Sequence, residues 1–180
     1  MADMPERTLS SRRAFNGRLL ALRVDKVELE TGRHATREVV EHPGAVAILA
    51  WDGERLAAVR QWRQAAGAEL LEIPAGTREP GEEPLITAQR ELAEECGLSA
   101  AQWEVGPAFY TAPGFSTELL TLFLATDLHG VDTPPPEDEA LERSWLTLDD
   151  ALAAVDDGRI RDAKSLVGIL WLARHLPSNG

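Results

Sequence analysis

The chain has 180 residues, of which 44% are hydrophobic, and a formal net charge of -12. This length and composition predict one domain, or one domain with a small extension, that buries a substantial core. The negative charge argues against unspecific binding to nucleic acid or to an anionic membrane, because both depend on basic surface. An anionic substrate would therefore need local basic residues or metal ions.

The sequence offers no targeting or disulfide signal. The segment MADMPERTLSSRR lacks an apolar signal core, and no apolar run approaches the roughly 20 residues of a membrane span. We therefore expect a cytoplasmic protein. Cys96 is the only cysteine, so an internal disulfide and a cysteine-based zinc site are excluded, and the thiol is expected to fill space.

The first half of the chain is predicted to be rich in strands. Residues 1–16 are interpreted as a polar, loosely ordered lead-in, and residues 18–42 as strands around a turn. Residues 44–63 predict two apolar strands around Asp52-Gly53, a dipeptide typical of a tight hairpin. A short strand is expected at residues 70–73.

The second half mixes helices with strands. Pro84 suits the first turn of a helix that ends before Gly97, with an apolar stripe at spacings of three and four residues. Further strands are expected at 105–111, 118–125 and 143–146, and helices after Thr147 and at 162–175. Because the elements do not alternate strictly, the pattern favours an α/β sandwich with a mixed β-sheet over a doubly wound fold.

Glu91, Glu94 and Glu95 lie off the apolar stripe of the Pro84 helix and close together. Like charges at this spacing repel one another, and the C-terminal end of a helix is the unfavourable pole for anions. A hard divalent ion such as Mg²⁺ would compensate this repulsion, and the preceding glycine-rich segment would let the carbonyl of Ala75 or Gly76 complete its coordination. A solvated acidic helix face is the alternative interpretation of an isolated REXXEE motif.

The longer pattern resembles the Nudix box. Gly76 is followed after five residues by Glu82, and after seven more by RELAEECGL, with Leu92 and Leu98 at the apolar positions. The resemblance implies an α/β/α sandwich that hydrolyses a nucleoside diphosphate linked to another group. It also implies that Glu91, Glu94 and Glu95 bind metal, that Glu82 is a further or outer carboxylate, and that Arg90 orients them. Mg²⁺ is the expected cofactor, with Mn²⁺ or another divalent ion as alternatives.

Other segments resemble the ADP-ribose pyrophosphatase branch of this family: VRQWR, LEIPAG, APGFSTE, EDEALE and the β-rich N-terminal arm. Pro113 also stands sixteen residues after Gly97, as that branch requires. The resemblance implies a small-molecule substrate, ADP-ribose, cleaved to AMP and ribose 5-phosphate. The alternatives are another ADP-sugar, a GDP-sugar or a dinucleotide, and, in a different class, a catalytically silent sensor that binds ADP-ribose.

Several residues are candidates for substrate contacts. Arg60 and Arg63 are an odd number of residues apart and leave a strand on opposite faces, so one of them can face the cleft. The resemblance assigns a phosphate or ribose contact to Arg63, whereas an exposed surface arginine is the alternative. It also assigns substrate contacts to Pro113 and Gly114, and Glu118 is expected either to bind ribose hydroxyls or to be an exposed or capping residue.

The acidic loop and the arm complete the expected site. The resemblance implies a mobile loop carboxylate that activates water, for which Glu139 is the first choice and Glu137 and Glu142 are alternatives. It also implies that residues 1–42 form a dimerisation arm on a Nudix domain of residues 43–180, so we expect a homodimer. Arg37 and Glu38 would then contact the adenine in the partner's cleft. No nucleic-acid or membrane partner is expected.

Overall fold

The computed structural model describes residues 5–134 and 141–176. The chain divides into two compact units, Met1–Gly44 with Tyr110–Leu119 and Ala45–Phe109 with Leu120–Gly180. We describe each unit by itself. The described part of the chain contains no helix that is long and apolar enough to cross a membrane.

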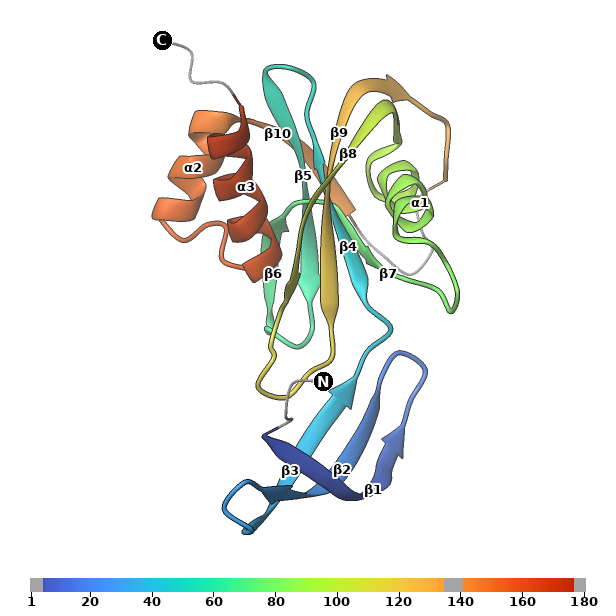
Figure 1. Cartoon of the computed structure of the whole chain (residues 1–180). Helices are drawn as coiled ribbons and strands as arrows, with labels where there is room; N and C mark the ends of the chain where they lie inside the picture. Colours follow the sequence, from blue (N-terminus) through green and yellow to red (C-terminus); the bar gives the residue numbers. More distant parts are fainter. Residues whose placement is uncertain (1–4, 135–140, 177–180) are drawn as a thin grey trace. The chain divides into compact units, whose positions relative to one another are not determined.

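The first unit is built on a three-stranded antiparallel sheet in the order β1-β2-β3 (Figure 1), formed by β1 (Glu6–Asn16), β2 (Ala21–Leu29) and β3 (His34–Glu41). The prediction of a loosely ordered lead-in is therefore wrong for residues 6–16. Their polar side chains obscured the strand, because β1 is exposed along almost its whole length and shows no alternation of apolar and polar residues. Val40 and Thr117 join β3 to the segment 110–119 through backbone hydrogen bonds.

The second unit contains two sheets. One has the order β10-β5-β6, and the other, β7-β4-β9-β8, is mixed because β4 pairs antiparallel with β7 and parallel with β9. The strands are β4 (Ala45–Ala50), β5 (Arg55–Arg63), β6 (Ala68–Glu72), β7 (Ala75–Thr77), β8 (Leu98–Tyr110), β9 (Leu119–Gly130) and β10 (Leu141–Thr147). Strand β8 begins at Leu98, earlier than the residue 105 that the sequence predicted.

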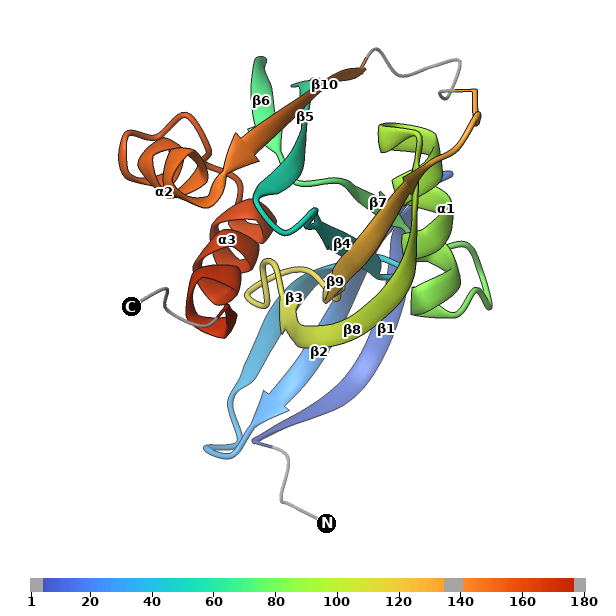
Figure 2. The same ribbon diagram turned by 90° about the horizontal axis from the view of Figure 1, so that it is seen from above.

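Helices cover both sides of these sheets (Figures 1 and 2): α1 (Pro84–Cys96) on one side, and α2 (Leu148–Asp156) with α3 (Ala163–His175) on the other. Strand β4 is buried on both faces, so its side chains alternate between two cores. Ala47 and Leu49 pack in the core that includes α2 and α3, whereas Val46 and Ile48 pack in the core that includes Ala88 and Leu92 of α1. This arrangement is the α/β/α sandwich that the sequence predicted.

The turn at Asp52-Gly53 forms, but the strands around it do not make one extended hairpin. Asp52 accepts hydrogen bonds from the backbone N–H groups of Glu54 and Arg55 through Oδ1. Beyond the bridge between Trp51 and Leu56, however, β4 and β5 belong to different sheets. Both strands are buried on both faces and therefore fit the interior of a layered unit better than an isolated hairpin.

Candidate active site

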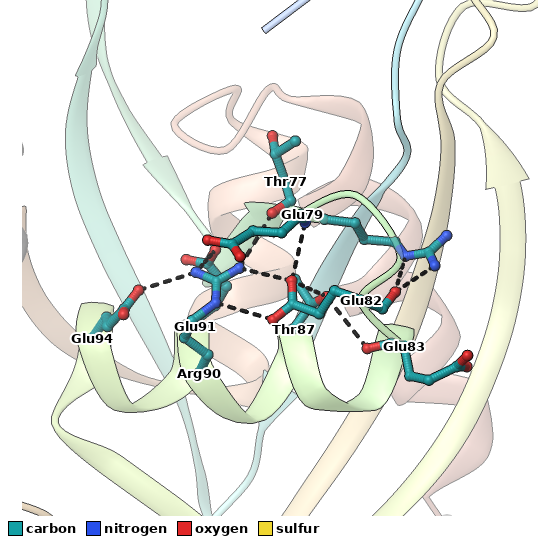
Figure 3. Close-up of polar contacts among 9 residues, drawn as sticks. Thr77, Glu79, Glu82, Glu83, Thr87, Arg90, Glu91 and Glu94 are labelled. Carbon is teal, nitrogen blue, oxygen red and sulfur yellow. Dashed lines mark hydrogen bonds and ion pairs between the residues drawn. The ribbon is translucent and has the colours of Figure 1, made fainter. Parts of the chain in front are cut away.

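Arg90 lies among three carboxylates at the centre of the predicted box (Figure 3). Its Nη1 is 2.7 Å from Oε1 of Glu91 and 3.1 Å from Oε2 of Glu94, and its Nη2 is 3.2 Å from Oε2 of Glu82. The positive charge of the guanidinium thus offsets part of the repulsion between glutamates that their spacing on the helix predicted. The hydrogen bonds to Glu82 and the nearby charge of Glu91 also raise the pKa of Arg90 above its ordinary value.

Arg90 also joins the helix to the segment that precedes it. Nη2 of Arg90 donates to the backbone carbonyl of Thr77 at 3.3 Å, and Arg78 donates to the carbonyl of Glu82 through Nε at 3.1 Å. Arg90 therefore ties the segment before the helix to the helix itself.

Glu82 accepts hydrogen bonds from three residues. Besides Arg90, it accepts hydrogen bonds from the backbone N–H of Glu79 at 3.0 Å and from the hydroxyl of Thr87 at 2.9 Å. These donors, with the Arg90 bond as the largest cause, lower the pKa of Glu82 to about 2. Glu82 is therefore an anion throughout the neutral range.

Gly76 lies against the side chain of Glu91. A Cβ atom at Gly76 would stand 1.9 Å from both Cδ and Oε1 of Glu91, a distance no side chain could accommodate without displacing the carboxylate. This contact gives a physical reason for the glycine at the first position of the box. It also places a carboxylate directly on the backbone of β7.

Glu95 differs from the other box glutamates because it is buried. Glu95 is 3% exposed, and its Oε2 accepts a hydrogen bond from the backbone N–H of Ala75 at 2.9 Å. The sequence placed Glu95 off the apolar stripe, as its polar contact requires, but it did not reveal the burial. A buried carboxylate at this position is fixed in direction by β7.

The box residues fit a hard divalent ion by their chemistry. Glu95 contacts the backbone of Ala75 and Glu91 lies against Gly76, while Glu82 and Glu94 join them through Arg90. Mg²⁺ prefers carboxylate oxygens as ligands. Within residues 5–134 and 141–176, no group of three or more acidic, histidine or cysteine side chains is arranged to hold an ion as it stands. Arg90 occupies the space between three of the carboxylates (Figure 3).

A second polar cluster in the same unit holds Arg63. Its guanidinium donates to Glu72 at 3.0 and 2.6 Å, and Lys164 lies between Glu72 and Asp162. Glu72 is 1% exposed, and burial alone would raise its pKa. The hydrogen bonds from Arg63 and Lys164 outweigh this effect, so that the pKa of Glu72 lies below its ordinary value.

Four of the predicted substrate residues come together in the first unit. Arg37, Glu38, Pro113 and Gly114 line a hollow of about 980 Å³, together with Tyr110, Phe115 and buried Asp25. Arg37 is also paired with Glu6. Segments 70 residues apart in sequence thus meet in one concave surface, which is the usual form of a small-molecule site.

The other predicted residues that the structure describes do not join either of these groups. Glu118 does not line this hollow: it accepts a hydrogen bond from the hydroxyl of Thr111 and lies 3.6 Å from His42. Arg60 is exposed and 3.9 Å from Glu69. Glu142 is exposed on β10, where its Cα pairs with that of Arg60. Glu137 and Glu139 lie outside the described residues.

Sequence reasoning missed three residues of these clusters, Glu72, Thr87 and Lys164. It also missed Arg143, whose Nε donates to the backbone carbonyl of Glu95 at 2.6 Å. Thr87 could have been found, since it lies five residues after Glu82 in the first turn of the helix. Glu72 stands between the apolar residues Leu71 and Ile73, and a carboxylate in such a segment indicates a cationic partner in the interior. Lys164 and Arg143 carried no local signal, because their partners are 92 and 48 residues away.

Two family models match the chain. A model described as NUDIX domain matches residues 41–166, and one described as Nucleoside diphosphate sugar hydrolase N-terminal domain matches residues 6–40. Together the two models match residues 6–166.

Individual proteins match over nearly the whole chain. The ADP-ribose pyrophosphatase of Bacillus subtilis (strain 168) is 41% identical over 175 residues, which are 96% of this chain and 95% of the relative. The methanol dehydrogenase activator of Bacillus methanolicus is 40% identical over 170 residues, covering 93% and 92%. A solved structure titled "Crystal structure of ADP compounds hydrolase" shares the fold, with a TM-score of 0.87, 21% identity and coverage of 98% and 97%.

Proposed function

The chain belongs to the Nudix family, and from this premise we propose that it hydrolyses the pyrophosphate bond of ADP-ribose, giving AMP and ribose 5-phosphate. The observation that carries the proposal is the Arg90-centred cluster of box carboxylates, complete in every position of the motif. The 41% identity to an ADP-ribose pyrophosphatase over 96% of the chain supports the substrate.

The reaction adds one water to the pyrophosphate: a P–O bond of the bridge breaks, a new P–O bond forms, and a water proton is released. We propose Mg²⁺ as the ion, which would be held by Glu91, Glu94 and Glu95, with Glu82 and the Ala75 carbonyl nearby. When bound, the ion would neutralise charge at the phosphoryl oxygens and lower the pKa of the attacking water. Arg90 fixes the directions of three carboxylates, and the Ala75 N–H fixes Glu95.

The proton of the attacking water needs an acceptor. We propose Glu139 for this step, with Glu137 and, on β10, Glu142 as the alternatives. For the substrate we propose contacts from Arg63, whose guanidinium is held by Glu72, with Arg60 and Glu118 as further contacts. We also propose contacts from Pro113 and Gly114, and contacts that Arg37 and Glu38 make in the partner's cleft. A catalytically silent sensor is disfavoured because all four box carboxylates are present.

We also propose a homodimer formed through the arm of residues 1–42. Strand β1 pairs with β2 along one edge, and its other edge has no strand partner among the described residues. Exposed apolar side chains gather on and beside this strand, namely Leu9, Phe15, Leu19 and Leu20. Unpaired strand edges with apolar side chains favour association. A cytoplasmic location suits the single, unpaired cysteine, Cys96.

A substrate panel tests the proposal. The protein would be incubated with Mg²⁺ and ADP-ribose, ADP-glucose, GDP-mannose, NAD and diadenosine compounds, and the products would be identified by mass. We expect kcat/KM for ADP-ribose to exceed that for each other compound by about tenfold or more. A higher value for another nucleoside diphosphate compound would replace the substrate but keep the reaction, whereas tight binding of ADP-ribose without products would establish a sensor.

A further inference from the structure

The C-terminal end of α1 is held by a residue outside the box. Nε of Arg143, on β10, donates to the carbonyl of Glu95 at 2.6 Å, and Nη2 donates to the carbonyl of Glu94 at 3.3 Å. These are backbone oxygens of two residues whose side chains are the proposed metal ligands. Arg143 therefore contacts the part of the backbone that carries these two carboxylates.

This end of the helix has few other means of satisfying its carbonyls. The last turn of α1 contains no basic residue, although its free carbonyls carry partial negative charge and two glutamates lie there. An arginine that reaches a helix C-terminus from another element supplies both hydrogen bonds and charge. Arg143 supplies them from β10, which follows α1 by more than forty residues.

The glycine that ends the box leaves room for this contact. Gly97 adopts φ 61°, the left-handed conformation that ends a helix, and a Cβ added to it would lie 2.8 Å from Nη1 of Arg143. The carbonyl of Gly97 also accepts the N–H of Val131 at 2.9 Å. The end of α1 is thus fixed by β10 through Arg143 and by the residue after β9.

We propose that Arg143 is a positioning residue for the reaction: by binding the carbonyls of Glu94 and Glu95 it fixes the last turn of α1, and so the directions in which these carboxylates meet the metal. The inference rests on the proposed function. Productive metal sites require their ligands to be held within a fraction of an ångström by groups that do not touch the ion. A side chain that bonds two consecutive ligand backbones meets that requirement.

If Arg143 acted only through its charge, its removal would change the affinity for the metal ion in the opposite direction. A guanidinium beside carboxylates disfavours a cation, so removing its charge would tighten metal binding if the helix end stayed in place. Loss of positioning would instead weaken metal binding and lower kcat. The two effects can therefore be separated by titrating the protein with metal alone.

The test compares Arg143→Met, Arg143→Lys and the wild type, with Arg159→Met as a matched control because Arg159 pairs with Asp157 on the surface. Mn²⁺ alone is titrated by electron paramagnetic resonance, amide exchange at Cys96 and Gly97 is measured without metal, and kcat and KM are measured for ADP-ribose. For Arg143→Met we expect faster exchange at both amides, Mn²⁺ binding weaker by about threefold or more, and kcat lower by about tenfold with KM nearly unchanged. Arg143→Lys should lie between this variant and the wild type.

Three results would overturn the proposal: unchanged exchange and kcat in Arg143→Met, Mn²⁺ binding that tightens while kcat is unchanged, or the same losses in Arg159→Met. If Arg143→Met does not fold, Arg143→Lys decides by the same measurements, because it keeps the charge but cannot reproduce both bonds. Mn²⁺ binding and amide exchange do not require turnover. They therefore report on Arg143 even if ADP-ribose is not the substrate of the wild type.

Discussion

At the scale of single residues, each box glutamate is distinguished by what holds it. Glu82 is bound by Arg90, Thr87 and a backbone N–H, Glu91 and Glu94 share Nη1 of Arg90, and Glu95 is buried against Ala75. Four carboxylates of one motif thus have separate environments. Substitutions at these positions should accordingly separate catalysis from folding.

Glu95→Gln should remove most activity without unfolding the protein. The amide has the volume of the carboxylate and can still accept the N–H of Ala75, but it lacks the charge that a metal ligand needs. We expect kcat to fall by about 10²-fold or more and the metal-free melting temperature to change little. Steady-state kinetics and thermal denaturation check both, with the exposed hairpin residue Glu54→Gln as control. Near-wild-type kcat at saturating Mg²⁺ would remove Glu95 from the ligand set.

Gly76→Ala should displace Glu91, because the added Cβ would lie 1.9 Å from its Cδ and Oε1. We expect a strong fall in kcat and only a small change in the free energy of unfolding, because the atoms that the Cβ meets belong to the flexible side chain of Glu91, which can turn away. Gly130→Ala is the matched control, since a Cβ there meets no atom within 4 Å. Urea denaturation and kinetics of both variants provide the measurement, and wild-type activity in Gly76→Ala would contradict the observed contact.

The thiol of Cys96 should be unreactive in the folded protein. Burial in the core beside α1, together with the charge of Glu95, raises the pKa of Cys96 to about 12. At pH 8 only about 10⁻⁴ of the thiol would be ionised. Reaction with Ellman's reagent should therefore follow the rate of unfolding, and fast labelling under native conditions would show that the helix end opens.

At the scale of elements, the contacts that hold the Gly76–Gly81 segment against α1 depend on the charge of Glu82. The folded-state pKa of Glu82, about 2, lies below its ordinary value of 4.5. Its contribution to stability is therefore present above pH 4.5 and is lost as the pH falls towards 2.

The free energy of unfolding of metal-free wild type should consequently exceed that of Glu82→Gln at pH 6, and the difference should shrink between pH 4.5 and pH 2. Urea denaturation of both proteins in EDTA at a series of pH values measures it. Glu79→Gln is a suitable control, because Glu79 binds Glu82 through its backbone N–H, which the substitution keeps. A difference that stays constant over this range would show that Glu82 is not held as an anion.

The elements that the sequence predicted well are those whose signals are local. Pro84, the apolar spacing and Gly97 delimit α1, and Thr147 caps α2 by accepting the N–H of Asp150. Strand β1 was missed because both its faces are exposed, so it lacks the alternation that identifies a strand. The division of β4 and β5 between two sheets was missed because pairing partners distant in sequence decide it.

The candidate site shows the same limit. The resemblance to the box predicted that Arg90 orients its carboxylates, and each of them lies within eight residues of Arg90. The Arg63–Glu72–Lys164 cluster and the contact of Arg143 with α1 join distant segments, and no local pattern indicates them.

At the scale of the whole molecule, association through β1 should depend on its exposed apolar side chains. Phe15→Asp with Leu19→Asp would place charges where the proposed interface buries apolar surface. We expect light scattering to show a dimeric wild type and a monomeric double variant, together with weaker ADP-ribose binding. Leu170→Asp, on the exposed side of α3, is the control. A monomeric wild type that binds ADP-ribose tightly would refute the shared cleft and leave the box unaffected.

The most direct measurement of the central claim is the hydrolysis of ADP-ribose in ¹⁸O-labelled water with Mg²⁺, followed by mass spectrometry. We expect equal amounts of AMP and ribose 5-phosphate, one ¹⁸O atom in one of the two products, and no turnover when EDTA removes the ion. Intact ADP-ribose after prolonged incubation with folded, Mg²⁺-saturated protein would contradict it, as would products other than these two phosphate monoesters.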